Sequence, residues 1–222
     1  NAMPRARQRM KRDKGGLFVV LRDVSMSMAG VNATWSARVT LGLLEEARRR
    51  QMRFGYIEFN HTAKKYRHAA DGSFFTHDYD AVSDVATQLK CSGWTNYEQP
   101  LSHALEEFEV DRILNRSSSA PQQRHVLLIT DGVPTHGDPE ATMQRLQARA
   151  QGVVVHSVYL GHPMMFPSAL EAISQDTQGI RFAAFYEAAR RRTKAGKPST
   201  TESTQKPTVG TSLDSGSIKV VQ

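Results

Sequence analysis

Short apolar runs alternate with segments of helical periodicity along most of the chain. The runs are continuous and rich in β-branched residues, which is typical of strands buried on both faces in a parallel sheet. "HVLLITDG" (125–132) is the clearest of them. On this pattern we predict strands at 16–23, 53–59, 64–68, 125–132, 153–161 and 180–185.

The segments between these runs have the apolar spacing of amphipathic helices. In the first of them, apolar residues recur on one side of the predicted helix, and Arg48, Arg49 and Arg50 close it where cations are favoured by the helix dipole. The apolar stripe consists of Trp35, Val39, Leu43, Leu44 and Ala47. We predict helices at 34–51, 79–90, 97–113, 139–152, 167–179 and 186–192.

Strands that alternate with helices predict right-handed crossovers in a single sheet. The link between 53–59 and 64–68 is too short for a helical crossover, so these two strands form a hairpin. The predicted fold is therefore α/β: a doubly wound, mostly parallel six-stranded sheet with one antiparallel edge strand and helices on both faces. The apolar end "IKVVQ" (218–222) is compatible with one more short strand, which this prediction leaves out.

The net charge of +7 lies at the two ends of the chain. Residues 1–14 hold six basic residues against Asp13, and residues 193–222 hold four basic residues against two acidic ones, so 15–192 is neutral. We interpret 1–14 as an expression-tag remnant with a basic segment, 15–192 as one domain, and 193–222 as a flexible tail rich in Ser, Thr, Lys and Pro. A neutral domain with basic ends does not favour a nucleic-acid partner.

The composition also excludes several classes of site. The one cysteine, Cys91, excludes an intramolecular disulfide and a Cys-rich zinc site. No "GxxxxGK[ST]" motif for a nucleotide phosphate is present, and no stretch has the length and apolarity of a membrane span or signal peptide. We therefore expect a cytoplasmic protein without a membrane partner.

Two of the predicted strands end in aspartate, Asp23 and Asp131. Because parallel strands end at one rim of a sheet, both carboxylates are expected at that rim. Ser25 and Ser27 stand at alternate positions behind Asp23, and Thr95 offers a third hydroxyl. Oxygen ligands of this kind suit a hard cation such as Mg²⁺. The same residue types also favour helix caps and turns, which is the alternative explanation.

These residues carry a family resemblance. "DVSMS" (23–27), "GWTN" (93–96) and "TDG" (130–132) resemble, in order and spacing, the three loops of the metal-ion-dependent adhesion site of von Willebrand factor A domains. The resemblance implies that Ser25, Ser27 and Thr95 contribute hydroxyls to a cation, with Asp23 and Asp131 as carboxylates in or just outside its ligand shell. It also implies a doubly wound sheet with an antiparallel edge strand.

The function that this resemblance implies is binding, not catalysis. A carboxylate of a protein partner would complete the coordination of Mg²⁺, with Mn²⁺ or Ca²⁺ as alternatives, and Met26, Trp94 and Asn96 would contact the partner near the metal. In its short loops and lone cysteine, the chain is more similar to intracellular members of the family than to adhesion receptors. Such members include magnesium chelatase subunits and proteins that work beside MoxR-type AAA+ ATPases. An AAA+ ATPase is therefore a candidate partner.

Three positions depart from the family's usual pattern: Arg22, Met26 and Trp94. Arg22 could pair with a carboxylate at the rim and supply a positive charge there already. Met26 stands where glycine is usual and requires a backbone without positive φ. A degenerate scaffold with no bound metal is thus one alternative. The other is a metal-dependent phosphatase or phosphotransferase with Asp23 as nucleophile. Such a site uses a second carboxylate two residues after the first, and this chain has Ser25 there instead.

Overall fold

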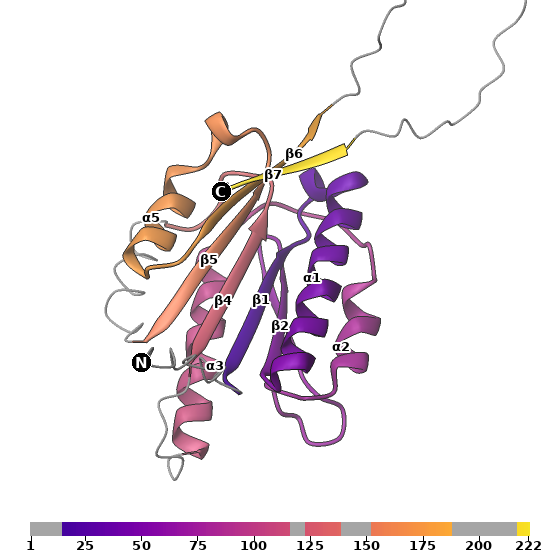
Figure 1. The fold of residues 1–222 in the computed structure, drawn as a ribbon, viewed down its shortest axis with the longest axis vertical. Coiled ribbons are helices and arrows are strands. Elements are labelled where there is room, and N and C mark those ends of the chain that lie inside the picture. Colours follow the sequence, from indigo (N-terminus) through magenta and orange to yellow (C-terminus); the bar gives the residue numbers. More distant parts are fainter. Residues whose placement is uncertain (1–14, 116–122, 139–151, 188–216) are drawn as a thin grey trace, which may run out of the picture.

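A seven-stranded sheet forms the centre of the molecule, and helices pack on both of its faces (Figure 1). The computed structural model describes residues 15–115, 123–138, 152–187 and 217–222. The strands are β1 (Leu17–Asp23), β2 (Arg53–Phe59), β3 (Ala63–Tyr66), β4 (Arg124–Thr130), β5 (Val153–Leu160), β6 (Arg181–Glu187) and β7 (Ser217–Val221). The α-helices are α1 (Val31–Arg50), α2 (Tyr79–Ala86), α3 (Glu98–Leu114) and α5 (Ser168–Asp176), and the 3-10 turns are η1 (Met26–Met28) and η2 (Pro163–Met165).

The strand order β3-β2-β1-β4-β5-β6-β7 confirms the predicted doubly wound α/β fold. Neighbouring strands from β2 to β6 run parallel, and β3 pairs antiparallel with β2 as the predicted hairpin requires. The predicted count of six strands is wrong by one. Near the end of the chain, β7 pairs antiparallel with β6 and gives the sheet a second antiparallel edge.

The same pairing corrects the predicted helix at 186–192. Glu187 pairs with Ser217, so β6 continues through the first two residues of that range, and the remainder lies outside the described residues. The pattern "YEAARRR" is helical in isolation, but pairing with a strand distant in sequence decides the conformation of its start. The predicted helix at 139–152 also lies outside the described residues, apart from Gly152.

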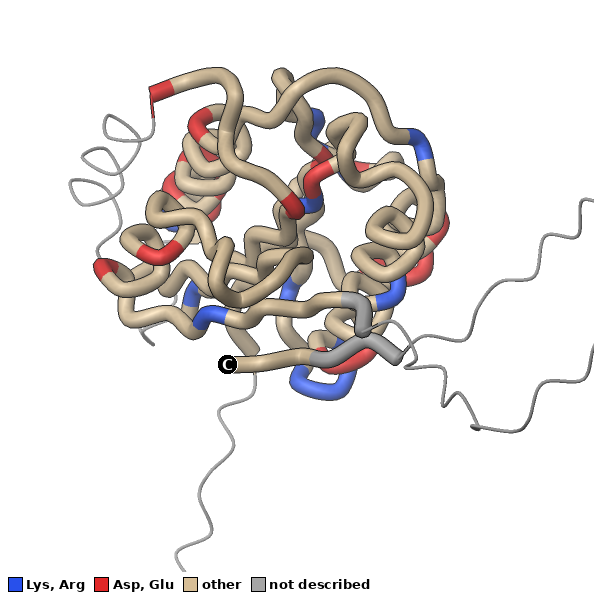
Figure 2. The backbone as a smooth tube through the Cα atoms, turned by 90° about the horizontal axis from the view of Figure 1, so that it is seen from above, with Lys and Arg blue, Asp and Glu red and all other residues tan. Residues whose placement is uncertain are grey.

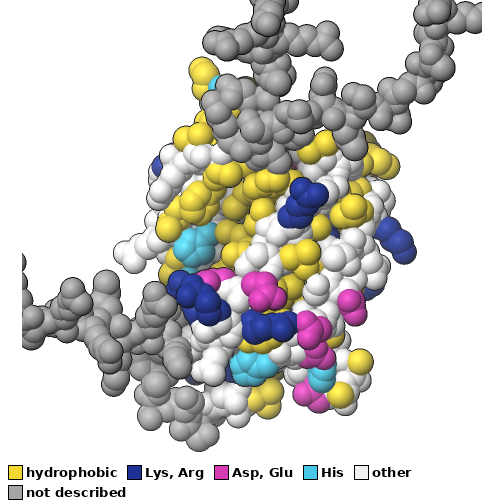
Figure 3. Space-filling view, turned by 45° about the vertical axis from the view of Figure 1, so that its right-hand side comes forward, with side chains coloured by type: hydrophobic (Ala, Val, Ile, Leu, Met, Phe, Trp, Pro, Cys, Tyr) yellow, Lys and Arg dark blue, Asp and Glu magenta, His cyan; other side chains and the backbone are white. Residues whose placement is uncertain are grey.

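Side chains that alternate along each strand supply two separate apolar layers. On one face, Leu21 and Leu128 pack with α3 and α5; on the other, Val20 and Ile129 pack with α1 and α2. The predicted stripe of α1 faces this second layer, with Leu44 and Ala47 buried and the rest packed against them. Figure 3 shows hydrophobic side chains gathered along one face of the molecule, above a group of charged and histidine side chains. Within the part of the chain described here, no helix is both long and apolar enough to cross a membrane.

Gly179, between α5 and β6, packs against the backbone of β5. A Cβ atom there would lie 1.8 Å from the carbonyl oxygen of Val155. We expect Gly179→Ala to lower the free energy of unfolding by about 1–3 kcal/mol, because backbone atoms have to move. Gly42→Ala is the control, since a Cβ on that helical residue meets nothing within 4 Å, and it should stabilise by about 0.5–1 kcal/mol. Urea unfolding of both variants measures the difference, and equal midpoints would contradict the close approach.

Candidate metal centre

The ends of β1 and β4 form the middle of the sheet rim. The two strands pair in parallel, so Asp23 at the end of β1 lies beside Thr130 and Asp131 at the end of β4. Figure 2 looks onto the molecule from this side, and acidic residues lie near the centre of the view. The sequence prediction that both carboxylates emerge at one rim agrees with this placement.

Asp23 is a buried carboxylate that joins the end of β4 to the turn that carries Ser25 and Ser27, called the serine turn below. Its side chain is 1% exposed. Oδ1 accepts a hydrogen bond from the backbone N–H of Ser25 at 2.8 Å, and Oδ2 accepts one from the hydroxyl of Thr130 at 2.6 Å. Burial raises the pKa of Asp23 from 3.8 to about 6, although both hydrogen bonds oppose this rise. Asp131 adds to it through charge repulsion.

The raised pKa of Asp23 predicts a specific pH dependence of stability for the metal-free protein. Between pH 4 and 6 the folded state holds a proton that the unfolded state has released, so stability falls as pH rises through this range. The loss should be about 3 kcal/mol, complete above pH 6 and absent below the unfolded pKa. Unfolding in EDTA at several pH values should show this slope in wild type relative to Asp23→Asn. A constant difference between the two proteins would contradict it.

Ser25, Ser27 and Asp131 form a chain of oxygens at the rim. The hydroxyls of Ser25 and Ser27 lie 3.1 Å apart, and the Ser27 hydroxyl donates to Oδ1 of Asp131 at 2.8 Å. The turn η1 brings the two serines to one side, since Ser25 precedes it in extended conformation and Ser27 lies within it. Asn32, in the first turn of α1, donates to the other oxygen of Asp131 at 3.0 Å.

Thr95 lies on a loop between the serine turn and the loop that follows β4. The carbonyl of Gly93 accepts a hydrogen bond from the N–H of Met26 at 3.1 Å, which joins the Thr95 loop to the serine turn. The carbonyl of Thr95 accepts one from the N–H of Thr135 at 2.9 Å, which joins it to the loop after β4. Thr95 itself is 4% exposed. The three sequence motifs therefore meet at one rim.

The donor set fits a hard divalent cation. Hydroxyl and carboxylate oxygens are the ligands that Mg²⁺ takes, usually together with water. Across the described residues, no group of three or more His, Cys, Asp or Glu side chains is arranged so that it could hold a metal ion. A zinc site of the usual composition is thus not formed there, and hydroxyls are needed to complete any cation site at this rim.

The side chain of Arg22 has other partners than Asp23 and Asp131, so the possible pairing with one of these rim carboxylates is not formed. Arg22 alternates with Asp23 along β1, so its side chain enters the opposite layer beneath α1 and α2, where it is fully buried. The guanidinium donates to the carbonyl oxygens of Ala33 and Ala86 at 3.0 and 2.7 Å and lies 3.7 Å from the Glu58 carboxylate. Its positive charge is therefore paired with Glu58 and not with Asp23 or Asp131.

The other two unusual positions are compatible with the site. Met26 lies in η1, and among the described non-glycine residues only Gln51 and Gln178 have positive φ, so the glycine usual at this position is not needed. Met26 and Trp94 are each 63% exposed, as residues in contact with a partner would be. The side chain of Trp94 lies beside His136, with ring centroids 6.0 Å apart.

Asn96 differs from the other two predicted contact residues because it is buried. Its side chain is 8% exposed, and its Oδ1 accepts a hydrogen bond from the N–H of Glu98 at 2.9 Å. Its backbone N–H donates to the carbonyl of Asn60 at 2.9 Å. Asn96 therefore fixes the loop at the start of α3, and the predicted role in partner contact does not fit this burial.

Sequence reasoning missed three residues that support the site: Asn32, Thr130 and Thr135. Asn32 orients Asp131, Thr130 orients Asp23, and the hydroxyl of Thr135 accepts from the N–H of Thr95 at 3.2 Å. Thr130 adjoins Asp131 in sequence and could have been suspected for that reason. The other two have no local signal, because their partners are distant in sequence.

Comparison with known proteins agrees with this architecture. The family model described as von Willebrand factor type A domain matches residues 18–191. The chain is also similar to two solved structures from Bacteroides. For the conserved hypothetical protein BatB from Bacteroides thetaiotaomicron, the TM-score is 0.58 at 15% identity, over 76% of this chain and 90% of that one. For an aerotolerance-related membrane protein from Bacteroides fragilis, the TM-score is 0.57 at 15% identity, over 75% and 90%.

A von Willebrand factor type A structure from Catenulispora acidiphila is similar as well, with a TM-score of 0.57 at 15% identity over 77% of this chain and 38% of that one. At these identities the likeness concerns the fold alone. No curated protein sequence matches the chain significantly.

Proposed function

Because the chain belongs to the von Willebrand factor type A domain family, whose members are generally non-enzymatic interaction modules, we propose that it binds a protein carboxylate through a divalent cation. The cation is Mg²⁺, with Mn²⁺ or Ca²⁺ as substitutes, and it is held at the sheet rim. The residues that hold it are Asp23, Ser25, Ser27, Thr95 and Asp131.

The observation that carries this proposal is the chain of hydroxyl and carboxylate oxygens at the ends of β1 and β4. The hydroxyls of Ser25 and Ser27 lie 3.1 Å apart on one turn, and the Ser27 hydroxyl donates to Asp131, which lies on a loop far from that turn in sequence. The alternative explanation was helix caps and turns. The hydrogen bond from Ser25 N–H to Asp23 is of the kind that the turn part expects, whereas the capping part is not supported by the geometry. Ser25 is the N-cap of η1 without a side-chain cap hydrogen bond, and the N-cap of α1 is Gly30.

Each residue has a separate role in this proposal. The hydroxyls of Ser25, Ser27 and Thr95 supply neutral oxygen ligands, and Asp131 supplies the negative charge closest to the surface. Asp23 holds the serine turn by accepting from the N–H of Ser25. When bound, Mg²⁺ supplies positive charge that attracts a carboxylate from outside the chain. The neutral hydroxyls leave that charge only partly compensated, which favours an anionic partner group.

The phosphatase alternative is weakened by the surroundings of Asp23. A nucleophile must reach its substrate, yet this carboxylate is 1% exposed and both of its oxygens accept hydrogen bonds. The geometry suits an orienting group better than an attacking one. A flat response across a panel of phosphoesters in Mg²⁺ is expected.

The cellular setting of the partner is a further part of this proposal. The lone cysteine and the short loops favour an intracellular assembly with an AAA+ ATPase as the candidate partner. The likeness in fold to an aerotolerance-related membrane protein makes an assembly at a membrane the second candidate. Co-purification of the tagged chain from its own organism, with and without EDTA, would distinguish the two settings by the partner recovered.

Calorimetric titration with Mg²⁺ and Mn²⁺ tests the cation site. Wild type should bind one ion, and Ser27→Ala should bind it at least about 10-fold more weakly, because a ligand hydroxyl is removed. Ser168→Ala is the matched control, since Ser168 is exposed at the start of α5. Equal affinities in all three proteins, or no binding, would remove the metal from the account.

The carboxylate part of the proposal has its own experiment. The two tryptophans, Trp35 and Trp94, can be labelled as 5-fluorotryptophan and followed as separate ¹⁹F resonances, assigned with Trp94→Phe. Capped aspartate at millimolar concentration should shift the Trp94 resonance in Mg²⁺ but not in EDTA. Capped asparagine, its neutral isostere, should leave the resonance in place, and equal shifts from both would contradict carboxylate binding.

A further inference from the structure

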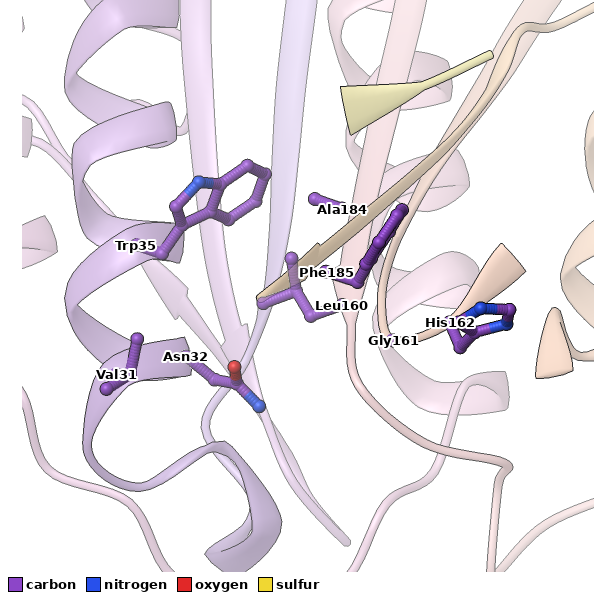
Figure 4. A pocket seen from close by; sticks show the side chains of 8 residues that line it. All are labelled: Val31, Asn32, Trp35, Leu160, Gly161, His162, Ala184 and Phe185. Atoms are coloured by element: carbon purple, nitrogen blue, oxygen red, sulfur yellow. The ribbon is translucent and has the colours of Figure 1, made fainter. Parts of the chain in front are cut away.

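A groove opens beside the candidate metal centre, between the first turns of α1 and the ends of β5 and β6 (Figure 4). Its volume is about 290 Å³. This is just below the roughly 300–1,000 Å³ usual for small-molecule sites, so one or two side chains would fill it. The residues that line it are Val31, Asn32, Trp35, Leu160, Gly161, His162, Ala184 and Phe185.

The walls of the groove are mostly apolar. Trp35 projects from α1 on one side, and Phe185 lies on the opposite side, on β6 (Figure 4). Leu160 and Ala184 are 8% and 3% exposed, so they belong to the core behind the groove. A surface hollow with an aromatic side chain on each side favours an apolar occupant.

Asn32 joins the groove to the candidate metal centre. It lines the groove, and its side-chain amide donates to Oδ2 of Asp131 at 3.0 Å. One side chain thus separates the two, and a partner that reaches the cation lies at the mouth of the groove. In an extended peptide, side chains one or two residues apart are close enough to occupy both.

Exposed apolar side chains lie on the segments that form both features. Val31 is 50% exposed at the lip of the groove, and Met164 and Met165 are 87% and 69% exposed in η2, which directly follows the lining residue His162. Around the metal centre, Met26 and Trp94 are each 63% exposed. Exposed apolar groups gathered around a polar centre mark a binding surface, and methionine adapts its shape to different partners.

We infer that the partner segment carries a large apolar side chain within two residues of its cation-binding carboxylate, and that this side chain occupies the groove. This inference rests on the proposed function, because the carboxylate positions the segment. It specifies the partner as an acidic segment flanked by leucine, methionine or phenylalanine. The rim selects the charge and the groove selects the neighbouring side chain.

The two fluorinated tryptophans test this directly, because Trp35 lines the groove and Trp94 lies on the Thr95 loop. The probes are two sets of capped peptides at equal concentration in Mg²⁺. In one set an aspartate is flanked by Leu, Met or Phe, and in the other it is flanked by Ser. The apolar set should shift both resonances and the serine set only that of Trp94, and EDTA should abolish every shift.

The possible failures are distinguishable. If both sets shift only Trp94, the metal-bridged carboxylate remains and the groove is not part of the binding surface. If neither resonance responds to any peptide, the proposed function itself fails. If Trp35 shifts equally with and without Mg²⁺, or with protein concentration alone, the groove binds an apolar ligand or a second copy independently of the rim, and the inference is overturned.

A matched pair of variants supplies a second test. Val31→Gln makes the groove lip polar without adding charge near the cation, and it should weaken the apolar peptides about 3- to 10-fold while Mg²⁺ binding is unchanged. Val110→Gln is the control, because Val110 is 47% exposed on α3, which packs on the other face of the sheet. Equal peptide affinities of the two variants would contradict the assignment.

Discussion

Replacing Arg22 with methionine is expected to lower the free energy of unfolding by about 3–5 kcal/mol. Arg22 is fully buried between β1 and the two helices on that face. Its guanidinium satisfies the carbonyl oxygens of Ala33 and Ala86 and the hydroxyl of Ser36, and it lies near the Glu58 carboxylate. Without it, buried acceptors on both helices each lose one donor.

The cost is expected to be large because methionine fills the space but donates no hydrogen bond. The hydroxyls of Tyr56 and Tyr66 still donate to Glu58, at 3.1 and 2.6 Å, so that carboxylate keeps two hydrogen-bond donors when Arg22 is removed. The Ser36 hydroxyl also donates to the Ala33 carbonyl at 3.0 Å, so the loss of a donor falls mainly on the Ala86 carbonyl at the end of α2. The guanidinium is therefore a structural link between α1, α2 and the sheet.

Urea or thermal unfolding measures this effect. Arg38→Met is the matched control, since Arg38 is exposed on α1 and its replacement should change stability by less than about 0.5 kcal/mol. If the two variants are equally stable, Arg22 does not carry the buried network assigned to it.

The second large effect is expected at the metal centre, where Asp131→Asn should lower Mg²⁺ affinity on the order of 100-fold. Both carboxylate oxygens have fixed partners, with Ser27 donating to one and Asn32 to the other. An amide of the same shape loses the negative charge and turns one acceptor into a donor, which then faces Ser27 or Asn32. Both changes disfavour a cation at this position.

Calorimetry with Mg²⁺ and with Mn²⁺ measures the loss. Asp84→Asn, an identical replacement at an exposed position on α2, should bind as wild type does. The stability of metal-free Asp131→Asn should be close to that of wild type, because Asp131 lies at the rim outside both core layers. Wild-type affinity in Asp131→Asn would place the cation elsewhere or exclude it.

Much of the fold followed from local pattern. The continuous apolar runs that became β1, β4 and β5 could be recognised because a strand buried on both faces leaves no polar alternation. The apolar stripe on α1 and the short link before β3 could be predicted from the local sequence in the same way. These features depend on residues close together in sequence.

Features that depend on distant pairing were not predictable in the same way. The short apolar run of β7 was compatible with a strand, but only its pairing with β6 decides that conformation. Pairing of Arg22 with a rim carboxylate was one possibility because Arg22 adjoins Asp23, yet strand alternation places its side chain in the opposite layer. Asn96 was expected at the surface, but its loop is closed by hydrogen bonds to Asn60 and Glu98 that the sequence does not reveal.

The candidate site could be predicted from the sequence only in part. Asp23 and Asp131 were placed together by the rule that parallel strands end at one rim, and their motifs supplied the serines and Thr95. The groove beside Asn32 had no signal in the sequence, because α1, β5 and β6 contribute to it jointly.

The central claim is that the rim oxygens hold a divalent cation, and a crystal structure of the full chain grown in MnCl₂ tests it most directly. An anomalous difference peak should appear beside the hydroxyls of Ser25, Ser27 and Thr95. Six oxygen ligands should surround it, at metal–oxygen distances close to the value of about 2.0–2.1 Å that is usual for Mg²⁺. The Ser27 hydroxyl should then contact the ion. The absence of a peak at saturating Mn²⁺, with the Ser27 hydroxyl still hydrogen-bonded to Asp131, would contradict the account.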